Sequence, residues 1–338
     1  VANGEKLPAE PPTAAGHSIE ARIYAEDPAK GWQPQAGTVH RFDVPATTTQ
    51  FGLTHRTGIR LDSGVVDGSV VSIHHDPMLA KVISFAPTRA RAAQVLADAL
   101  ARTRLHGVGT NRDLLVNVLR HPAFLVGATD TAFFDTHGLG VLSTPLAGAR
   151  AVRLSAVAAA IADAAFNRAT AGVLGGMPSG WRNVASGNQH KAFRDSTGTE
   201  HAIAYRFTRT GLHLPDDPGV ALICATDGEV VLSGDGVATA FTVARYGETI
   251  CVDSPLGAVA FTAVPRFPEP GSVLEKGSLL APMPGSVIRL GAALGEQVRA
   301  GQPLIWLEAM KMEHTITAPA DGVITALDVA VGQQVEVG

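Results

Sequence analysis

The sequence predicts a multidomain α+β protein, and three observations lead to this prediction. The first 140 residues mix strand-like and helical patterns, residues 141–275 consist mainly of short strand patterns separated by turns, and residues 276–338 are strand-like and internally repeated. A chain of 338 residues is long enough for two or three domains of about 150 residues each. We therefore expect three domains, at residues 1–140, 141–275 and 276–338.

The composition is typical of a globular protein and favours no polyanionic partner. Apolar residues make up 46% of the chain and the net charge is −4, so we expect neither nucleic acid nor an anionic membrane as a partner. No apolar run approaches the roughly 18 residues of a membrane-spanning helix. The two cysteines, Cys224 and Cys251, give neither a disulfide framework nor a metal-binding spacing, which fits a reducing compartment.

Three segments of the first region have the apolar or alternating pattern of strands: residues 19–24, 65–73 and 78–85. A helix should begin at Pro87 and end near Gly107, because apolar residues recur at helical spacing between them. A second helix should follow, with Thr110 as its N-cap and Pro122 at its end.

The middle region should begin with one helix, because apolar residues recur at helical spacing over residues 154–165. Six short strand patterns follow, at residues 202–208, 220–225, 229–232, 238–244, 249–252 and 258–264. This spacing favours an antiparallel barrel or sandwich. Prolines and glycines between residues 265 and 277 indicate a linker to the last region.

The last region contains an internal repeat. When the sequence is shifted by 37 residues, residues 281–301 fall on residues 318–338, and nine of these 21 positions are identical. Self-similarity at a fixed period indicates a repeated structural unit, and each half is too short to bury a core alone. We therefore predict that the two halves pack together as a pseudo-two-fold β-sandwich.

The segment that joins the two halves contains Ala309-Met310-Lys311-Met312. Strand patterns at residues 306–307 and 315–316 flank it, so Lys311 should lie near the tip of a hairpin. A tip presents its side chain to other proteins, and a lysine has a free amine that can be covalently modified. Without the repeat, the same residues would indicate a solvated lysine beside two packing methionines.

This segment resembles the attachment motif Ala-Met-Lys-Met of the biotinyl (biotin carboxyl carrier) domain. Residues 281–285 and 318–323 are also similar to that family. The resemblance implies that biotin is attached to Lys311 through an amide, with Met310 and Met312 beside it, and that a biotin protein ligase is a partner. Biotin would supply the chemistry and the protein its presentation. A lipoyl domain shares the biotinyl fold, but its lysine typically follows aspartate rather than methionine.

Four motifs of the first region resemble the C-terminal subdomain of biotin carboxylase, an ATP-grasp-type enzyme: residues 16–28, 60–64, 76–81 and 107–111. In that family the arginine of the Glu-Ala-Arg-Ile motif stabilises the biotin enolate, which implies that Arg22 is catalytic. A fixed guanidinium can offset a developing oxyanion. Spacing alone would equally allow a structural ion pair between Arg22 and Glu20 or Glu26.

Other charged residues of the first region have less defined roles. Lys81 and Arg60 are either structural or lie at a subunit contact. Residues 74–76, His-His-Asp, raise the question of a metal site. Because adjacent residues on a strand point to opposite faces, we predict that they bind no metal.

The resemblance to a whole biotin carboxylase is incomplete. The glycine-rich phosphate loop, the metal-binding glutamates and the bicarbonate-binding residues of that family are absent from this sequence. We expect the chain to be the C-terminal part of a longer subunit that uses ATP, Mg and bicarbonate. The carrier region should likewise have a closing strand after Gly338.

The middle region separates the two family-like regions by about 140 residues, whereas a carboxyltransferase barrel needs roughly 250. Its size, its leading helix and its strands resemble the domain that docks the α subunit onto the β subunit in propionyl-CoA and 3-methylcrotonyl-CoA carboxylases. In that family this domain is an antiparallel β-barrel around a helix. An accessory barrel without a binding role is the alternative.

Together these resemblances imply a ligase, the α subunit of a biotin-dependent acyl-CoA carboxylase, most like the 3-methylcrotonyl-CoA enzyme. Its partner would be a carboxyltransferase β subunit in an α/β hetero-oligomer. The alternatives are a propionyl-CoA or broad acyl-CoA carboxylase and a non-catalytic biotinyl or lipoyl carrier. The scarcity of lysine suggests a GC-rich bacterial genome, so the expected location is the bacterial cytoplasm, or the mitochondrial matrix in a eukaryote.

Overall fold

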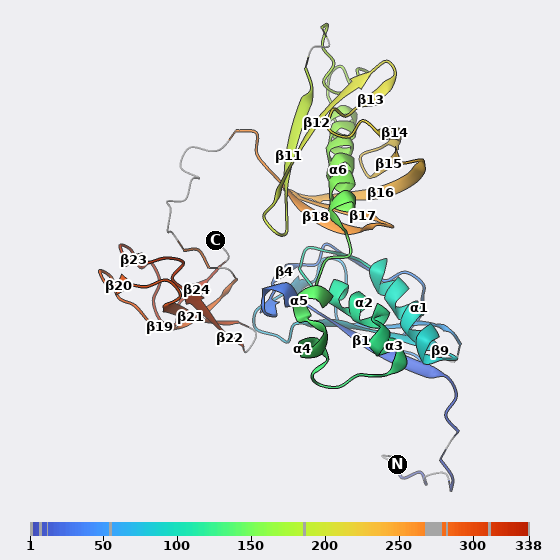
Figure 1. Cartoon of the computed structure of the whole chain (residues 1–338), viewed down its shortest axis with the longest axis vertical. Helices are drawn as coiled ribbons and strands as arrows, with labels where there is room; N and C mark the ends of the chain where they lie inside the picture. Colours follow the sequence, from blue (N-terminus) through green and yellow to red (C-terminus); the bar gives the residue numbers. More distant parts are fainter. Residues whose placement is uncertain are drawn as a thin grey trace.

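The computed structural model describes residues 3–6, 9–11, 13–53, 56–184, 187–267, 279–281, 283–309 and 312–336 (Figure 1). Its helices and strands form three groups that follow one another along the chain: a sheet with helices on one face, a barrel around a long helix, and a small β-structure near the C-terminus. Within the described residues, no helix is long and apolar enough to cross a membrane.

The first group is built on a four-stranded sheet in the order β1-β9-β7-β6: β1 (His17–Tyr24), β9 (Met78–Ala86), β7 (Gly58–Ser63) and β6 (Thr47–Gln50). Two helices, α1 (Arg89–Ala101) and α2 (Arg112–Arg120), pack against it. Alternation along β1 and β9 buries Ile23 and Val82 beneath α1, whose Leu96 and Leu100 are fully buried. The opposite face of the sheet keeps the charged side chains.

Shorter elements complete this group: β2 (Glu26–Asp27), a 3-10 turn (Pro28–Lys30), β3 (Gln33–Pro34), β4 (Gly37–Thr38), β5 (Arg41–Asp43), β8 (Val70–Val71), β10 (Arg104–His106), α3 (Pro122–Val126), α4 (Phe133–His137) and α5 (Leu139–Leu142). The two predicted helices are present. The first, α1, ends at Ala101 and not near Gly107, because residues 104–106 form β10 and pair with β5. The second, α2, begins after Asn111 rather than after Thr110. Asn111 is held there because its Oδ1 accepts a hydrogen bond from the Tyr24 amide at 2.9 Å.

The predicted strand at residues 65–73 is wrong, because only Val70 and Val71 form a strand there. A turn precedes them, in which Gly68 adopts a φ of +89° and its amide donates to the carbonyl of Val39 at 2.7 Å. The side chain of Asp67 meanwhile accepts from the Phe42 amide at 2.7 Å. These two bonds tie the turn to β5 and interrupt the strand that hydrophobicity predicts.

The second group is an eight-stranded antiparallel sheet in the order β13-β12-β11-β18-β17-β16-β15-β14. Its strands are β11 (Gln189–Asp195), β12 (Glu200–Thr208), β13 (Gly211–His213), β14 (Val220–Ala225), β15 (Glu229–Gly234), β16 (Val237–Tyr246), β17 (Thr249–Ser254) and β18 (Gly257–Ala263). The sheet curls around α6 (Ala149–Ala169), as Figure 1 shows, and six of the strands contact this helix. The structure confirms the predicted barrel around a helix and adds β11 and β13.

Helix α6 is buried on nearly all sides over its central turns. Residues 156–160 (Ala-Val-Ala-Ala-Ala) are each 0–1% exposed, and Ile161 is 1% exposed. A helix that is apolar all round belongs in a core, and the small alanines let the strands approach closely. Aromatic side chains of the strands then fill the remaining space: Phe193, Tyr205, Phe241 and Phe261.

The third group consists of β19 (Gly285–Leu290), β20 (Gln297–Val298), β21 (Pro303–Ala309), β22 (Met312–Thr317), β23 (Gly322–Val323) and β24 (Gln334–Val335). One sheet has the order β22-β21-β19-β24, and β20 pairs with β23. Gly285 pairs with Val335, and the equivalent positions 37 residues away, Gly322 and Val298, are also paired. Each half of the repeat therefore pairs with a strand of the other half, which confirms the pseudo-two-fold β-sandwich. Residues 268–278, most of the predicted linker, lie outside the described residues.

Candidate functional site

The hairpin of β21 and β22 frames the lysine motif. The ladder between them runs from Pro303, opposite Thr317, to Ala309, opposite Met312. Met310 and Lys311 follow Ala309 in the sequence and lie outside the described residues, and of Met312 only the backbone is described. The prediction that strands flank the motif is confirmed on both sides.

The described part of this hairpin is firmly held. Leu307 and Ala309 of β21 are 1% and 3% exposed, while the intervening Glu308 is exposed, as strand alternation requires. On the next strand, β19, the guanidinium carbon of Arg289 lies 3.7 Å from the ring centroid of Trp306. This cation–π contact clamps β21 from its other side. The strands that flank the motif are therefore anchored in the sheet.

Arg22, the predicted catalytic residue, lies on β1 on the charged face of the first sheet. Its Nε donates to Oε1 of Glu20 at 2.8 Å, and 55% of its side chain is exposed. The hydrogen bond to Glu20, with a further one to Tyr24, raises the pKa of Arg22, so the guanidinium stays charged. The ion pair expected from spacing is thus present with Glu20, and it leaves the guanidinium accessible to a ligand.

Two further basic residues lie on the same face. Lys81 of β9 is opposite Arg22 on one side and opposite Asp62 of β7 on the other. Arg60 forms a two-point contact with Asp62, at 2.8 Å from Nε to Oδ1 and 2.6 Å from Nη2 to Oδ2. This contact lowers the pKa of the Asp62 carboxyl, which also accepts from the Phe51 amide at 3.0 Å. Arg60 is therefore bound within the sheet, whereas Lys81 lies next to Arg22.

Sequence reasoning missed the pairing of Arg60 with Asp62. The signal was present, because residues two apart on a strand share a face. Glu20 with Arg22 on β1 and Arg60 with Asp62 on β7 follow this rule, and β9 lies between the two pairs.

The His-His-Asp segment at residues 74–76 lies in a turn rather than on a strand, so the alternation argument does not apply to it. Nδ1 of His75 lies 2.9 Å from the hydroxyl of Ser72, and Oδ1 of Asp76 accepts from the Met78 amide at 3.0 Å. In the part of the chain that the structure describes, no group of three or more His, Cys, Asp or Glu residues could hold a metal ion.

The barrel group exposes apolar side chains in the segment between α6 and β11. The exposed fractions are 81% for Val173, 80% for Leu174, 58% for Trp181 and 71% for Val184. A neighbouring cavity of about 610 Å³ opens at the C-terminal end of α6, where Arg168 lines it together with Leu222 of β14. Several exposed apolar side chains in one segment are a feature of protein-binding surfaces.

Comparison with known proteins agrees with these three groups. Family models match as the biotin carboxylase C-terminal domain at residues 20–136, the BT domain of the methylcrotonyl-CoA carboxylase alpha subunit at 151–266, and the biotin-requiring enzyme family at 277–338. In this order, the three matches define a class of biotin-dependent carboxylase components.

Individual relatives narrow the class. The chain is 30% identical over 383 residues to the mitochondrial methylcrotonoyl-CoA carboxylase subunit alpha of Oryza sativa, covering 99% of this chain and 50% of that protein. It is 28% identical over 351 residues to the propionyl-CoA carboxylase alpha chain of Ruegeria pomeroyi, covering 95% and 50%. Along nearly its whole length the chain is similar to the alpha subunits of methylcrotonyl-CoA and propionyl-CoA carboxylases, and it spans about half the length of these curated relatives.

A solved structure is also similar to part of the chain. The biotin carboxylase domain of a thermophilic 2-oxoglutarate carboxylase bound to bicarbonate has 32% sequence identity, with a TM-score of 0.37. The similarity covers 42% of this chain and 30% of that one.

Proposed function

We propose that this chain carries biotin on Lys311 as part of an acyl-CoA carboxylase alpha subunit. The observation that carries the proposal is the sequence Ala309-Met310-Lys311-Met312 between the paired strands β21 and β22, inside a pseudo-two-fold fold. The match of residues 277–338 to the biotin-requiring family supports it.

The residues present fit a covalent biotin. A primary amine forms an amide with a carboxyl group, and lysine supplies such an amine on a long stem. This condensation requires an activated carboxyl, so a biotin protein ligase is the partner we propose for the attachment. Met310 and Met312 would flank the attachment site. When bound, biotin carries a carboxyl group on its ureido nitrogen between two reaction centres.

Arg22 is the residue we propose for charge stabilisation during biotin carboxylation. Its guanidinium is held at Nε by Glu20 and is more than half exposed. A positioned cation of this kind offsets negative charge that develops on an oxygen in the transition state. Lys81, opposite Arg22 in the sheet, would add positive charge to the same face.

We propose the barrel, with the apolar segment between α6 and β11, as the surface that docks a carboxyltransferase β subunit. The match to the BT domain and the exposure of Val173, Leu174 and Trp181 support this role. The three domains would have borders at residues 1–140, 141–275 and 276–338. ATP, Mg and bicarbonate would be used by the complete subunit in an α/β hetero-oligomer.

The substrate we propose is 3-methylcrotonyl-CoA, because the BT family model carries that name and the Oryza relative is a methylcrotonoyl-CoA carboxylase. Propionyl-CoA is the alternative that the bacterial relative supports. The proposed location is the cytoplasm of a bacterium or the mitochondrial matrix of a eukaryote.

Biotin attachment is tested by expressing the chain with a biotin protein ligase and detecting the product with streptavidin. We expect the wild-type chain to react and Lys311→Arg to lose the signal completely, because arginine cannot form the amide. Lys30→Arg is the matched control, since Lys30 is an exposed lysine paired with Asp27 at 3.5 Å. Intact mass should show one biotinyl group in the wild type and in the control.

A streptavidin signal that survives Lys311→Arg would overturn the site assignment. Modification of Lys311 by a lipoyl group instead of biotin, visible in the same mass measurement, would assign the chain to the lipoyl carriers.

Arg22 is tested in the assembled holoenzyme by measuring carboxylation. We expect Arg22→Gln to lower kcat by about a hundredfold or more, the usual effect of removing a preorganised oxyanion donor. Its streptavidin signal should stay at the wild-type level. Arg102→Gln, which removes an exposed ion pair with Asp98 on α1, should leave kcat unchanged. A fall in kcat of less than twofold for Arg22→Gln would contradict the proposed role.

A further inference from the structure

His106 of β10 is a buried histidine that the proposed reaction does not use. Its side chain is 5% exposed, and both ring nitrogens meet side chains of the barrel. Nε2 lies 2.9 Å from Oδ2 of Asp253 on β17, and Nδ1 lies 3.2 Å from the hydroxyl of Tyr246 on β16. These partners are 147 and 140 residues away in the sequence, so the contacts join the first group of elements to the barrel.

The hydrogen-bonding capacity of His106 is fully used in its neutral form. The Asp253 carboxylate can only accept, so Nε2 carries the proton and donates to it. Nδ1 then accepts from the hydroxyl of Tyr246. Burial raises the pKa of Tyr246, which keeps this hydroxyl protonated as a donor. A buried polar side chain normally has a hydrogen-bond partner, and the partners of both His106 ring nitrogens lie in the barrel.

A stacked pair of rings covers this contact. The ring of His40 lies parallel to that of Tyr246, with centroids 4.3 Å apart and an interplanar angle of 7°. The backbone amide of His40 also donates to the carbonyl of His106 at 2.8 Å. Tyr246 is therefore held between two histidines of the first group, one at its hydroxyl and one at its ring face.

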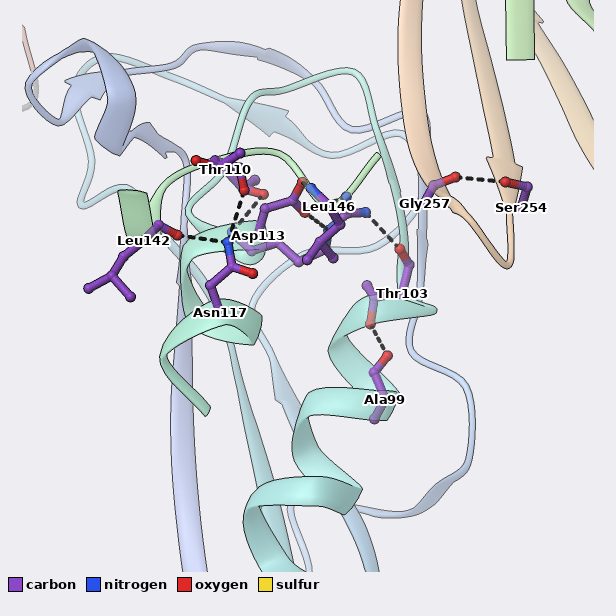
Figure 2. Close-up of polar contacts among 11 residues, drawn as sticks. Ala99, Thr103, Thr110, Asp113, Asn117, Leu142, Leu146, Ser254 and Gly257 are labelled. Atoms are coloured by element: carbon purple, nitrogen blue, oxygen red, sulfur yellow. Dashed lines mark hydrogen bonds and ion pairs between the residues drawn. The ribbon is translucent and has the colours of Figure 1, made fainter. Parts of the chain in front are cut away.

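The segment that connects the two groups, residues 143–148, is bonded to α2 on one side and contacts the barrel on the other. Oδ2 of Asp113 accepts from the Leu146 amide at 3.0 Å. The side-chain nitrogen of Asn117 donates to the carbonyl of Leu142 at the end of α5 and to that of Thr144 in the segment, at 2.8 and 2.9 Å. Figure 2 shows Asp113 and Asn117 of α2 directed at this segment. On the barrel side, a Cβ on Gly257 would lie 2.9 Å from the Ala147 nitrogen, so the turn between β17 and β18 packs directly on the connecting segment.

We propose that His40, His106, Tyr246 and Asp253 form an interdomain latch that fixes the biotin carboxylase C-terminal domain on the barrel as one rigid body. The first domain contacts the barrel at Tyr246 of β16 and Asp253 of β17, and the connecting segment contacts Gly257 at the start of β18. This inference does not depend on biotin attachment. Where the proposed function also holds, the latch gives the carboxylase domain a constant orientation relative to the β-subunit docking surface.

The latch is tested by measuring a distance between the two domains in the whole chain. Cys224 is exposed on the barrel and takes one spin label. A second label goes on Gln94→Cys, an exposed position of α1. Cys251 stays unlabelled, because it is buried and burial raises its pKa to about 12. Double electron–electron resonance then reports the distribution of distances between the two labels.

We expect a single narrow distribution in the wild-type background and at least a doubling of its width in His106→Ala. His75→Ala is the control, since His75 is exposed in the same domain and bonds only to Ser72 among the described residues. Asp253→Asn and Tyr246→Phe each remove less of the latch and should broaden the distribution less. If His106→Ala does not fold, the widths measured for these two variants decide the test instead.

Two outcomes would overturn the inference. One is a broad distribution in the wild-type background, which means that the domains are not held together. The other is a width that stays unchanged in every latch variant, which means that other contacts fix the orientation.

Discussion

The barrel and the carrier are both β-structures, but they are stabilised in opposite ways. In the barrel, eight strands enclose one helix, and α6 contributes a continuous buried stretch that contacts six of the strands. In the carrier, two similar halves pair with each other, and one of its described apolar clusters is formed by Val298, Leu304 and Ala318. The barrel therefore depends on packing around a central element, whereas the carrier depends on reciprocal pairing of short strands.

The largest expected effect on stability comes from a comparison of two equally buried leucines, one in the barrel and one in the carrier. Leu232 of the barrel and Leu307 of the carrier are both 1% exposed. Replacing a buried leucine by alanine costs about 2–5 kcal/mol, and the cost depends on how far the surroundings can collapse. We expect Leu232→Ala near the upper limit, because α6 fills the barrel and cannot move inward. Leu307→Ala should be nearer the lower limit, because the thin carrier sheet can relax.

Denaturant unfolding of the whole chain measures both values. Circular dichroism follows the helices, of which α6 is the longest described, and in a background with Trp32→Phe and Trp181→Phe the fluorescence of Trp306 on β21 follows the carrier. Equal costs for the two variants would show that the carrier core is as rigid as that of the barrel, and would remove this distinction between the two regions.

The same contrast explains how much of the fold could be predicted. The carrier repeat is visible as sequence identity at a fixed shift, and its positions have structural counterparts such as Gly285 and Gly322. Apolar spacing predicts the barrel helix but not β11. Only Phe193 of β11 is buried, and Lys191 on the same strand forms an ion pair with Asp163 inside the barrel. A strand whose inward residues are charged has no apolar alternation to reveal it.

The features of the candidate site also differ in whether a local sequence pattern predicts them. The lysine motif and Arg22 belong to local sequence patterns, so the sequence alone is enough to propose them. The pairing of Arg60 with Asp62 follows from their spacing once residues 58–63 are known to form a strand, because residues two apart on a strand share a face. The contact between His106 and Asp253 spans 147 residues and arises only from the packing of two domains. No local pattern predicts such a contact.

The smallest expected effect tests the symmetry of the carrier. Gly295 and Gly332 are equivalent in the repeat and have φ values of +84° and +85°. Their amides donate to Ile324 and Val287, which are also equivalent, at 2.8 and 2.7 Å. A Cβ at either glycine meets nothing within 4 Å, so the cost of alanine comes from the backbone alone. A left-handed conformation costs an alanine about 1 kcal/mol.

We therefore expect Gly295→Ala and Gly332→Ala to destabilise the carrier by the same amount, about 1 kcal/mol each, in denaturant unfolding followed through Trp306. Gly322→Ala is the control, since φ at Gly322 is not positive and its Cβ would also meet nothing within 4 Å. It should leave stability unchanged, or raise it slightly by restricting the unfolded chain. Two costs that differ by more than about 0.5 kcal/mol, the usual error of additivity between distant sites, would mean that the two turns contribute unequally to the stability of the carrier. Reciprocal pairing would then describe the geometry of the carrier but not its energetics.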